Sequence, residues 1–236
     1  SENDIATFRE EARHALAQAR SHGLLVAGGW GAAADVVAWL TGFEGMVVLA
    51  AEQPEFMEAL LDLVAQWNRR RLEVLLDVGI DLYLKRIFYE STDFWSTRLY
   101  RRFLQPILTA DVALAHQAGA KGGGMMTTGT LPLVDDLVVT GIDAIIGIDP
   151  LVTNLSAIKQ KAAGRIALWG GVNGYITVEQ GTEQETRAAV REALTAMAPG
   201  GGFVLSPVEN VRDGSDLTWR NTLALIDEWK RATGQA

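Results

Sequence analysis

Two carboxylic acids follow short apolar segments, where an α/β protein commonly places its reactive groups. Glu90 comes after the apolar segment 82–88, and Asp149 comes directly after the apolar segment 144–148. A carboxyl group in such a place can act as a general acid or base, because aromatic surroundings raise its pKa. The structural alternatives are an ion-pair or helix-entry residue for Glu90 and a turn residue for Asp149. For Asp149, the turn is the favoured interpretation.

Two adjacent cations, Lys85 and Arg86, lie within the segment 82–88. Successive side chains of a strand point to opposite faces, so that one of the two points inward, and the sequence does not say which. A charge that points inward must be paired or must hold a ligand. We select Arg86 as the anchor for a substrate carboxylate because a guanidinium offers two parallel donors. The alternative is a buried ion pair with Asp149, Glu90 or Glu209.

Further candidate residues follow the other apolar segments. Large aromatic rings at or after segment ends can line a pocket for a flat conjugated ligand, or can pack beneath loops: Trp30, Tyr89, Trp95 and Trp169. Polar side chains in similar places can reach a ligand or cap a loop: Thr127, Thr128, Asn173, Glu209, Asn210 and Arg212. Four other tryptophans are expected to pack helices onto a sheet: Trp39, Trp67, Trp219 and Trp229. Structural or solvent-exposed roles are expected for His14, His22 and His116.

A repeated succession of helix and short strand must position these residues. Apolar residues at helical spacing predict helices over 4–20, 54–79, 100–118, 131–139, 155–162, 182–197 and 217–231. Short apolar runs predict six strands, over 24–27, 82–88, 121–128, 144–148, 166–169 and 203–206. The strands show little alternation of polar and apolar residues, which is typical of a parallel sheet covered on both faces. Thr182 and Glu185 have the spacing of a capping box at a helix start.

Two architectures fit this order: an open doubly wound sheet and a (β/α)₈ barrel. The glycines around Trp30 do not have the spacing of a dinucleotide-binding loop. In both architectures ligands bind at the carboxyl ends of the strands. A barrel needs eight strands where six are visible, so the pattern leaves both open. Because no linker interrupts the chain, we expect residues 1–236 to form one domain.

Composition excludes several classes of function. The 236 residues include 21 basic and 29 acidic side chains and no cysteine, so that the net charge is −8. Without cysteine there is no disulfide, thiolate catalysis or Cys-based zinc site. A basic stripe for nucleic acid is absent, and no apolar run approaches the roughly 20 residues that span a bilayer. We therefore expect a cytoplasmic protein with a small-molecule substrate and neither nucleic acid nor membrane as partner.

Three segments resemble the uroporphyrinogen decarboxylase family, which also contains corrinoid- and cobamide-dependent methyltransferases and cobalamin-independent methionine synthase. They are 116–129 with 133–137 and 141–143, then 168–173, and, most specifically, the run 199–207 that reads Pro-Gly-Gly-Gly-Phe-Val-Leu-Ser-Pro. The resemblance covers about 24–230 and implies a (β/α)₈ TIM barrel. The six visible units and the lack of the family's Arg-rich N-terminal segment favour a shortened barrel or a fragment. A missing strand would leave an edge that invites homo-oligomerisation or a partner chain.

The resemblance implies decarboxylation of a tetrapyrrole carboxylate in porphyrin biosynthesis. Arg86 would anchor a carboxylate, and Glu90, with Asp149 as second choice, would handle the proton that replaces CO₂. No cofactor is expected, since a protonated pyrrole can accept the electron pair. Zinc-dependent relatives carry His and Cys ligands where this chain reads 125–129 and 206–210, so no metal is expected. Two alternatives remain: methyl transfer involving a corrinoid or a methylated small molecule, and a non-catalytic or fragmentary barrel that only binds a ligand.

Overall fold

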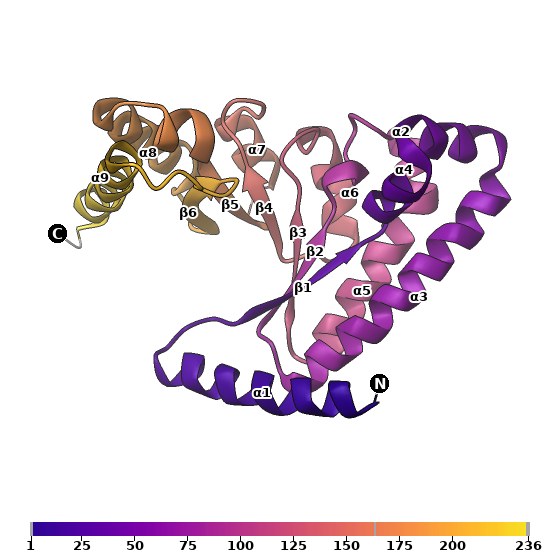
Figure 1. Ribbon diagram of the computed structural model, residues 1–236. Coiled ribbons are helices and arrows are strands. Elements are labelled where there is room, and N and C mark those ends of the chain that lie inside the picture. The colour runs from indigo at the N-terminus through magenta and orange to yellow at the C-terminus, as the bar shows by residue number, and fades with distance from the viewer. Residues whose placement is uncertain (1, 163, 235–236) are drawn as a thin grey trace. The chain divides into compact units, whose positions relative to one another are not determined.

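The computed structural model describes residues 2–162 and 164–234, apart from the side chain of residue 3, as alternating helices and strands (Figure 1). The α-helices are α1 (Glu2–Ser21), α2 (Ala34–Glu52), α3 (Pro54–Val78), α4 (Thr97–Phe103), α5 (Gln105–Gln117), α6 (Val134–Val139), α7 (Leu155–Ala162), α8 (Glu183–Met197) and α9 (Asp216–Thr233). The strands are β1 (Ala27–Ala32), β2 (Leu82–Arg86), β3 (Lys121–Met125), β4 (Ala144–Ile148), β5 (Ala167–Asn173) and β6 (Phe203–Val208). Short helical turns are η1 (Phe88–Glu90), η2 (Leu131–Leu133) and η3 (Gly174–Glu179).

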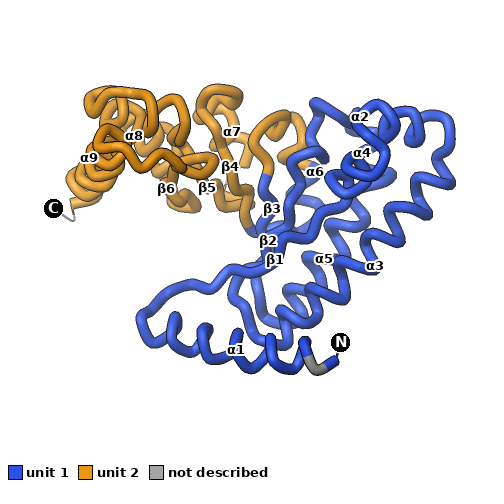
Figure 2. The backbone as a smooth tube through the Cα atoms, in the orientation of Figure 1, with its two compact units in different colours: residues 1–125, 136–143 blue, residues 126–135, 144–236 orange. Residues whose placement is uncertain are grey.

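The chain divides into two compact units, which are described separately (Figure 2). Unit 1 comprises residues 1–125 and 136–143, and unit 2 comprises residues 126–135 and 144–236. In unit 1, β1 pairs with β2 and β2 with β3, all in parallel. In unit 2, β4 pairs with β5 and β5 with β6, again in parallel. Each unit therefore has its own row of strand carboxyl ends, where side chains can meet.

The core of unit 1 joins α1 and α3 to the strands. Helix α3 begins with Pro54 in its first turn, where the missing N–H is harmless, and ends at Gly79, whose φ of 96° suits a residue without a side chain. Arg20 of α1 makes an ion pair with Asp81 at 2.7 Å. Buried side chains from helices and strands form one apolar cluster: Leu16, Leu72, Val78, Ile80, Tyr83, Ala115 and Ala120.

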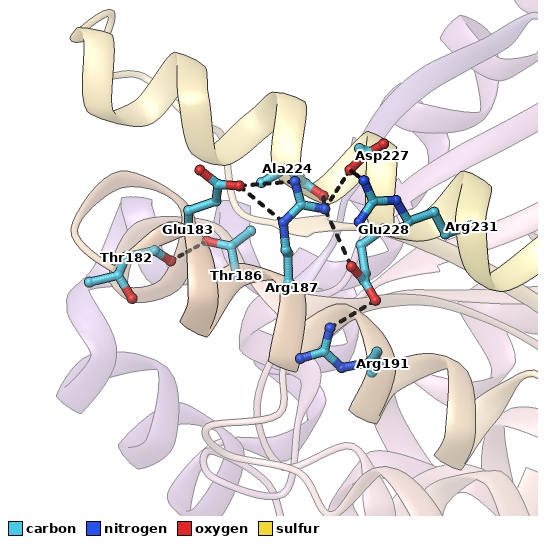
Figure 3. A network of polar contacts seen from close by, with 9 residues as sticks. All are labelled: Thr182, Glu183, Thr186, Arg187, Arg191, Ala224, Asp227, Glu228 and Arg231. Carbon is cyan, nitrogen blue, oxygen red and sulfur yellow. Dashed lines mark hydrogen bonds and ion pairs between the residues drawn. The ribbon is translucent and has the colours of Figure 1, made fainter. Parts of the chain in front are cut away.

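In unit 2, charged side chains join α8 to α9 (Figure 3). Arg187 contacts Glu183 at 2.9 Å, Asp227 at 2.6 Å and Glu228 at 3.3 Å. Arg191 adds a second contact to Glu228 at 2.8 Å. Most of these groups are partly exposed, so that each pair stabilises the helix packing only modestly. The predicted capping box at the start of α8, with Thr182 and Glu185, is confirmed.

Glycines explain where the predicted strand limits are wrong. Strand β1 covers 27–32 instead of 24–27, and β5 continues through Gly170 and Gly171, which were expected to end it. A Cβ atom on Gly29 would lie 2.3 Å from the Leu84 carbonyl oxygen, and one on Gly170 would lie 2.6 Å from that of Ile148. These glycines therefore allow close backbone approach inside the strands rather than marking turns.

Two helix predictions also need correction. The helix expected over 100–118 divides at Leu104 into α4 and α5, because Pro106 occupies the first turn of α5. Helix α2 was not predicted at all. By length and composition it is the one helix of the described residues that could span a membrane, and core helices can pass the same test. Gly42, with φ 73°, interrupts its helical backbone.

Candidate functional site

The end of β2 presents its two cations to opposite faces. The Lys85 ammonium contacts the Asp111 carboxylate of α5 at 2.5 Å, and both side chains are 1% exposed. Lys85 therefore faces the helix α5. Arg86 points to the opposite face of the strand, which is the orientation that a substrate anchor needs. The expected ion-pair partners were wrong: among the described residues Lys85 pairs with Asp111, and Arg86 pairs with Asp35.

Arg86 and Asp35 form the polar centre of unit 1. The Arg86 Nε donates to Asp35 Oδ1 at 2.5 Å, while Asp35 Oδ2 accepts from the Tyr89 backbone N–H at 3.3 Å. Asp35 is fully buried, and burial raises its pKa although the bond from Arg86 opposes the shift. Arg86 is 21% exposed, and its two terminal nitrogens have no hydrogen-bond partner among the described residues. These nitrogens have the geometry to bind a second carboxylate.

Four aromatic rings surround the Arg86 guanidinium. Its central carbon lies 4.7–5.9 Å from the ring centres of Phe88, Trp39, Trp30 and Tyr89. These distances are those of cation–π contacts, which stabilise the charged guanidinium and restrict its position. Tyr89 also meets Phe43 at 4.8 Å and Phe94 at 5.3 Å, so that the aromatic surface continues beyond the cation. The arrangement suits a flat ligand that carries a negative charge.

Trp30 reaches this group through an irregular backbone. Its φ is 115°, which is rare for a residue with a side chain, and the β1–β2 register skips it between Gly29 and Gly31. A bulge of this kind redirects a side chain at a sheet edge. Positive φ at a bulky residue stores strain of order 1–3 kcal/mol, which is a common property of functional positions. The bulge therefore places the predicted Trp30 ring beside Arg86.

Three tryptophan predictions were wrong. Trp39, Trp67 and Trp219 were expected to pack helices onto the sheet, but they are 58%, 54% and 63% exposed. Trp39 instead belongs to the Arg86 group and is absent from the predicted site, because α2 was not recognised. Its spacing of four residues from Asp35 would have placed both on one helix face.

Trp95, considered as a pocket wall, lies beneath the site instead. Its side chain is 3% exposed and packs against Phe103 at 6.1 Å between ring centres. Its indole N–H donates to the Tyr89 carbonyl oxygen at 2.7 Å. Trp95 therefore fixes the turn that carries Tyr89, and it offers no surface to a ligand.

Glu90 is enclosed at the end of η1. It is 1% exposed, and neither carboxyl oxygen has a side-chain hydrogen-bond partner among the described residues. Burial raises its pKa to about 7, although the charge of Lys85 opposes the shift; Asp35 and Asp111 raise it further. Glu90 can thus hold or release a proton near neutral pH, which a general acid or base must do. Its catalytic role stays a prediction.

The strand ends of unit 2 bring Asp149 and Asn173 together. The Asn173 amide donates to Asp149 Oδ2 at 2.8 Å, and the Leu151 backbone N–H donates to Asp149 Oδ1 at 3.0 Å. The Asn173 side-chain oxygen Oδ1 accepts from the Ile176 backbone N–H at 2.7 Å. Both side chains therefore close their own loops, as the turn interpretation of Asp149 expects.

The other predicted residues of unit 2 are spread along its strand ends. Thr127, Thr128 and Trp169 are partly buried, whereas Glu209 and Asn210 are exposed after β6. A Cβ on Gly174 would lie 3.4 Å from the Glu209 carbonyl oxygen, so that the β6 end approaches the residue after Asn173. Trp30, Arg86, Tyr89 and Glu90 belong to unit 1. A common rim of all these residues stays a prediction.

Six parallel strands that alternate with helices place the chain in the TIM-barrel-like α/β class, with six units. Residues 4–217 match the family model described as uroporphyrinogen decarboxylase (URO-D). The chain belongs to this family. The expectation drawn from its three sequence segments is thus confirmed.

Two solved structures share the fold. A methyltransferase from Methanosarcina mazei aligns with TM-score 0.75 and 18% identity over 89% of this chain and 59% of that one. The 3-keto-D-glucoside 4-epimerase YcjR from E. coli aligns with TM-score 0.51 and 16% identity, over 97% of this chain and 86% of the epimerase. The chain thus spans less than two thirds of the methyltransferase. No curated protein matches it.

Proposed function

We propose that this URO-D-family chain binds a substrate with several carboxylates and aromatic pyrrole rings, of the porphyrinogen class, and removes one carboxylate as CO₂. The observation that carries the proposal is the Arg86 guanidinium. One of its nitrogens is held by Asp35, the two terminal nitrogens are without partners among the described residues, and four aromatic rings surround it. The terminal nitrogens bind a substrate carboxylate, and the aromatic side chains contact the pyrrole rings of the substrate.

The reaction requires one proton and no redox partner. In an acetate side chain on a protonated pyrrole, the bond between the methylene carbon and the carboxylate breaks. CO₂ leaves, and the electron pair moves into the pyrrole ring. A proton then adds to the methylene carbon and produces a methyl group, and the pyrrole releases the proton that it had gained, so that one proton is consumed in total. Arg86 binds a carboxylate of the substrate and thereby holds the reacting side chain in place.

Glu90 supplies this proton in the proposal. A pKa of about 7 keeps a large share of Glu90 protonated at neutral pH. Because Glu90 is 1% exposed, transfer requires the turn η1 to move and open a path to the substrate. A Glu90→Gln variant should keep its affinity for the substrate and lose turnover.

Methyl transfer is the second candidate, because the aromatic rings around Arg86 suit a corrin as well as a porphyrinogen. The two ligands differ in their side chains. A porphyrinogen carries carboxylates, which a guanidinium binds with two parallel bonds, whereas the side chains of cobalamin are mainly neutral amides. The unoccupied donors of Arg86 therefore favour the polycarboxylate.

Ligand titration tests the proposal. Uroporphyrinogen, kept reduced without oxygen, and hydroxocobalamin would be titrated separately into the protein, with binding measured by isothermal titration calorimetry and CO₂ release by gas analysis. We expect uroporphyrinogen to bind and Arg86→Gln to weaken it about tenfold or more, in line with about 1.5–3 kcal/mol for a charged hydrogen bond. Arg102→Gln is the matched control, because that arginine pairs with Glu58 at 2.8 Å outside the aromatic group.

Each contrary result has a separate meaning. Binding without CO₂ release would support the non-catalytic alternative. Preference for hydroxocobalamin would support methyl transfer. Equal affinity of the Arg86→Gln variant and the original chain for uroporphyrinogen would remove Arg86 from the site.

A further inference from the structure

A cleft in unit 1 is lined by residues of α1, α3 and β1, none of which is among the rings around Arg86. Its volume is about 530 Å³. Apolar side chains form most of its wall: Ile5, Phe8, Trp67, Val74 and Leu75. Trp67, Arg71 and Val74 follow one another at helical spacing, so that α3 presents one stripe to the cleft. Ile5, Phe8 and Trp67 are each at least 40% exposed, although an apolar surface of this kind is normally covered.

Two cations line this apolar cleft, Arg70 and Arg71. Neither forms an ion pair or hydrogen bond among the residues that the structure describes, although the chain carries eight more acidic than basic groups. The guanidinium carbon of Arg71 lies 4.7 Å from the centre of the Trp67 ring. This contact holds the cation over the cleft and leaves its N–H groups available to an anion.

The cleft continues into a small polar recess. The recess has a volume of about 20 Å³, shares Gly29, Arg71 and Leu75 with the cleft, and is also lined by Asn68 and Tyr83. Tyr83 is 2% exposed and Asn68 3%, yet neither the Tyr83 hydroxyl nor the Asn68 carbonyl oxygen has a hydrogen-bond partner among the described residues. A recess of this volume accepts about one oxygen atom of a ligand.

Gly31 creates the room for this arrangement. A Cβ atom on residue 31 would lie 2.3 Å from the Tyr83 hydroxyl oxygen and 3.7 Å from the side-chain carbon of the Asn68 amide. The Tyr83 hydroxyl and the Asn68 amide therefore both lie close to the β1 backbone at Gly31. Buried polar groups without partners are unusual, and a bound ligand is one common explanation.

We propose that this cleft binds a small amphipathic carboxylate, such as a medium-chain fatty acid. The apolar chain of the ligand packs against Phe8, Trp67 and Val74. Its carboxylate is bound by Arg70 and Arg71, and one oxygen accepts from the Tyr83 hydroxyl. The Asn68 carbonyl oxygen is an acceptor and is not a partner of the carboxylate. The site is separate from the proposed decarboxylation, and either proposal can fail alone.

Decanoate is the probe, with decanol and decyltrimethylammonium as neutral and cationic controls of the same chain length. Isothermal titration at constant ionic strength should show decanoate binding at least tenfold more tightly than decanol, and no binding of the cation. The double variant Arg70→Gln/Arg71→Gln should lose this preference. Arg69→Gln is the matched control, because Arg69 belongs to the same run and does not line the cleft. Its affinity for decanoate should be unchanged.

Tyr83→Phe separates a binding role from a structural one. Because the hydroxyl has no hydrogen-bond partner in the part of the chain that the structure describes, its removal should leave the urea midpoint unchanged or raised, and should lower the affinity for decanoate severalfold. A second readout is quenching of tryptophan fluorescence by 2-bromodecanoate, which should diminish in Trp67→Phe. Equal affinity for decanoate and decanol, or quenching unchanged in Trp67→Phe, would overturn the proposal. Binding of a second copy of the chain, seen as a dimer that excludes decanoate, would also overturn it.

Discussion

The strand ends of both units contain polar and charged side chains, but these side chains differ in how fully they are hydrogen-bonded. In unit 2, Asp149 and Asn173 bond to each other and to the backbone of their own loops. In unit 1, Arg86 uses one nitrogen on Asp35, and the carboxyl group of Glu90 has no side-chain partner among the described residues. Loop closure thus accounts for Asp149 and Asn173, the paired polar residues of unit 2. It does not account for those of unit 1, where burial without full pairing reduces stability and is a common property of functional sites.

Breaking the buried pair of unit 1 should have the largest effect. Lys85→Met leaves the Asp111 carboxylate, itself 1% exposed, without its cation. We expect a loss of about 3–5 kcal/mol in the free energy of unfolding, because an uncompensated charge stays buried. Urea unfolding measures it. Lys121→Met is the control, since Lys121 is 67% exposed beside Asp143 and should contribute at most about 1 kcal/mol. Equal losses in both variants would contradict the comparison.

The pH dependence of Glu90 should be nearly as large. Its pKa is raised from 4.5 to about 7, so that the folded chain holds the proton more firmly than the unfolded chain. This stabilisation is fully present below pH 4.5 and is lost as the pH rises through 7. The expected loss is about 3 kcal/mol, from roughly 1.4 kcal/mol per pKa unit.

Unfolding of the Glu90→Gln variant isolates this contribution. Gln does not ionise, so the difference in unfolding free energy between the original chain and the variant should change between pH 4.5 and 7. The facing charged groups Lys85, Asp35 and Asp111 are the same in both proteins, so they cancel in the difference to a first approximation. A difference independent of pH would show that Glu90 titrates at an ordinary pKa.

In unit 2, removal of the Asn173 side chain should lower the free energy of unfolding by a smaller amount. Asn173→Ala loses the bond to Asp149 and the cap on the Ile176 backbone N–H. A cap of this kind contributes about 0.5–2 kcal/mol, and thermal unfolding should show a loss of that order. Asn210→Ala, at an exposed position after β6, should stay within about 0.5 kcal/mol. A loss as large as that of Lys85→Met would mean that the two regions do not differ as described.

The smallest expected effect concerns the charged contacts between α8 and α9. Arg231 is 61% exposed and pairs with Asp227, which Arg187 also contacts. Arg231→Ala should lower the free energy of unfolding by about 0.5 kcal/mol or less. Urea unfolding at low and high salt would check it, and a loss above about 1 kcal/mol would show a cooperative network.

Apart from α2 and the division at Leu104, the order of helices and strands could be predicted, because the spacing of apolar residues follows which face of an element is buried. The start of α8 followed from Thr182 and Glu185, whose spacing is local. The limits of β1 could not be predicted, since Gly29 permits an approach to Leu84 that only the folded pairing reveals. A glycine in the sequence can mark either a turn or a close approach of two backbones, and the sequence does not distinguish the two.

The candidate site was predicted only in part, because its residues come from distant positions. Arg86 was selected by type and place, and its partner Asp35 is 51 residues away on a helix that was not recognised. The Lys85 partner, Asp111, lies in α5, and the apolar pattern of that helix does not indicate that Asp111 is buried. Partners of this kind depend on how α2 and α5 pack against β2, which local spacing does not encode. The single domain expected for 1–236 stays a prediction.

Trp30 is a surplus residue in the pairing of β1 with β2. Gly29 pairs with Leu84 and Gly31 pairs with Lys85, so Trp30 has no partner residue in the β1–β2 register. Deleting that one codon would leave the rest of the strand, and Asp35 beyond it, in their present alignment. An ancestor could therefore have gained this ring through a single in-frame insertion, and a descendant could lose it just as simply.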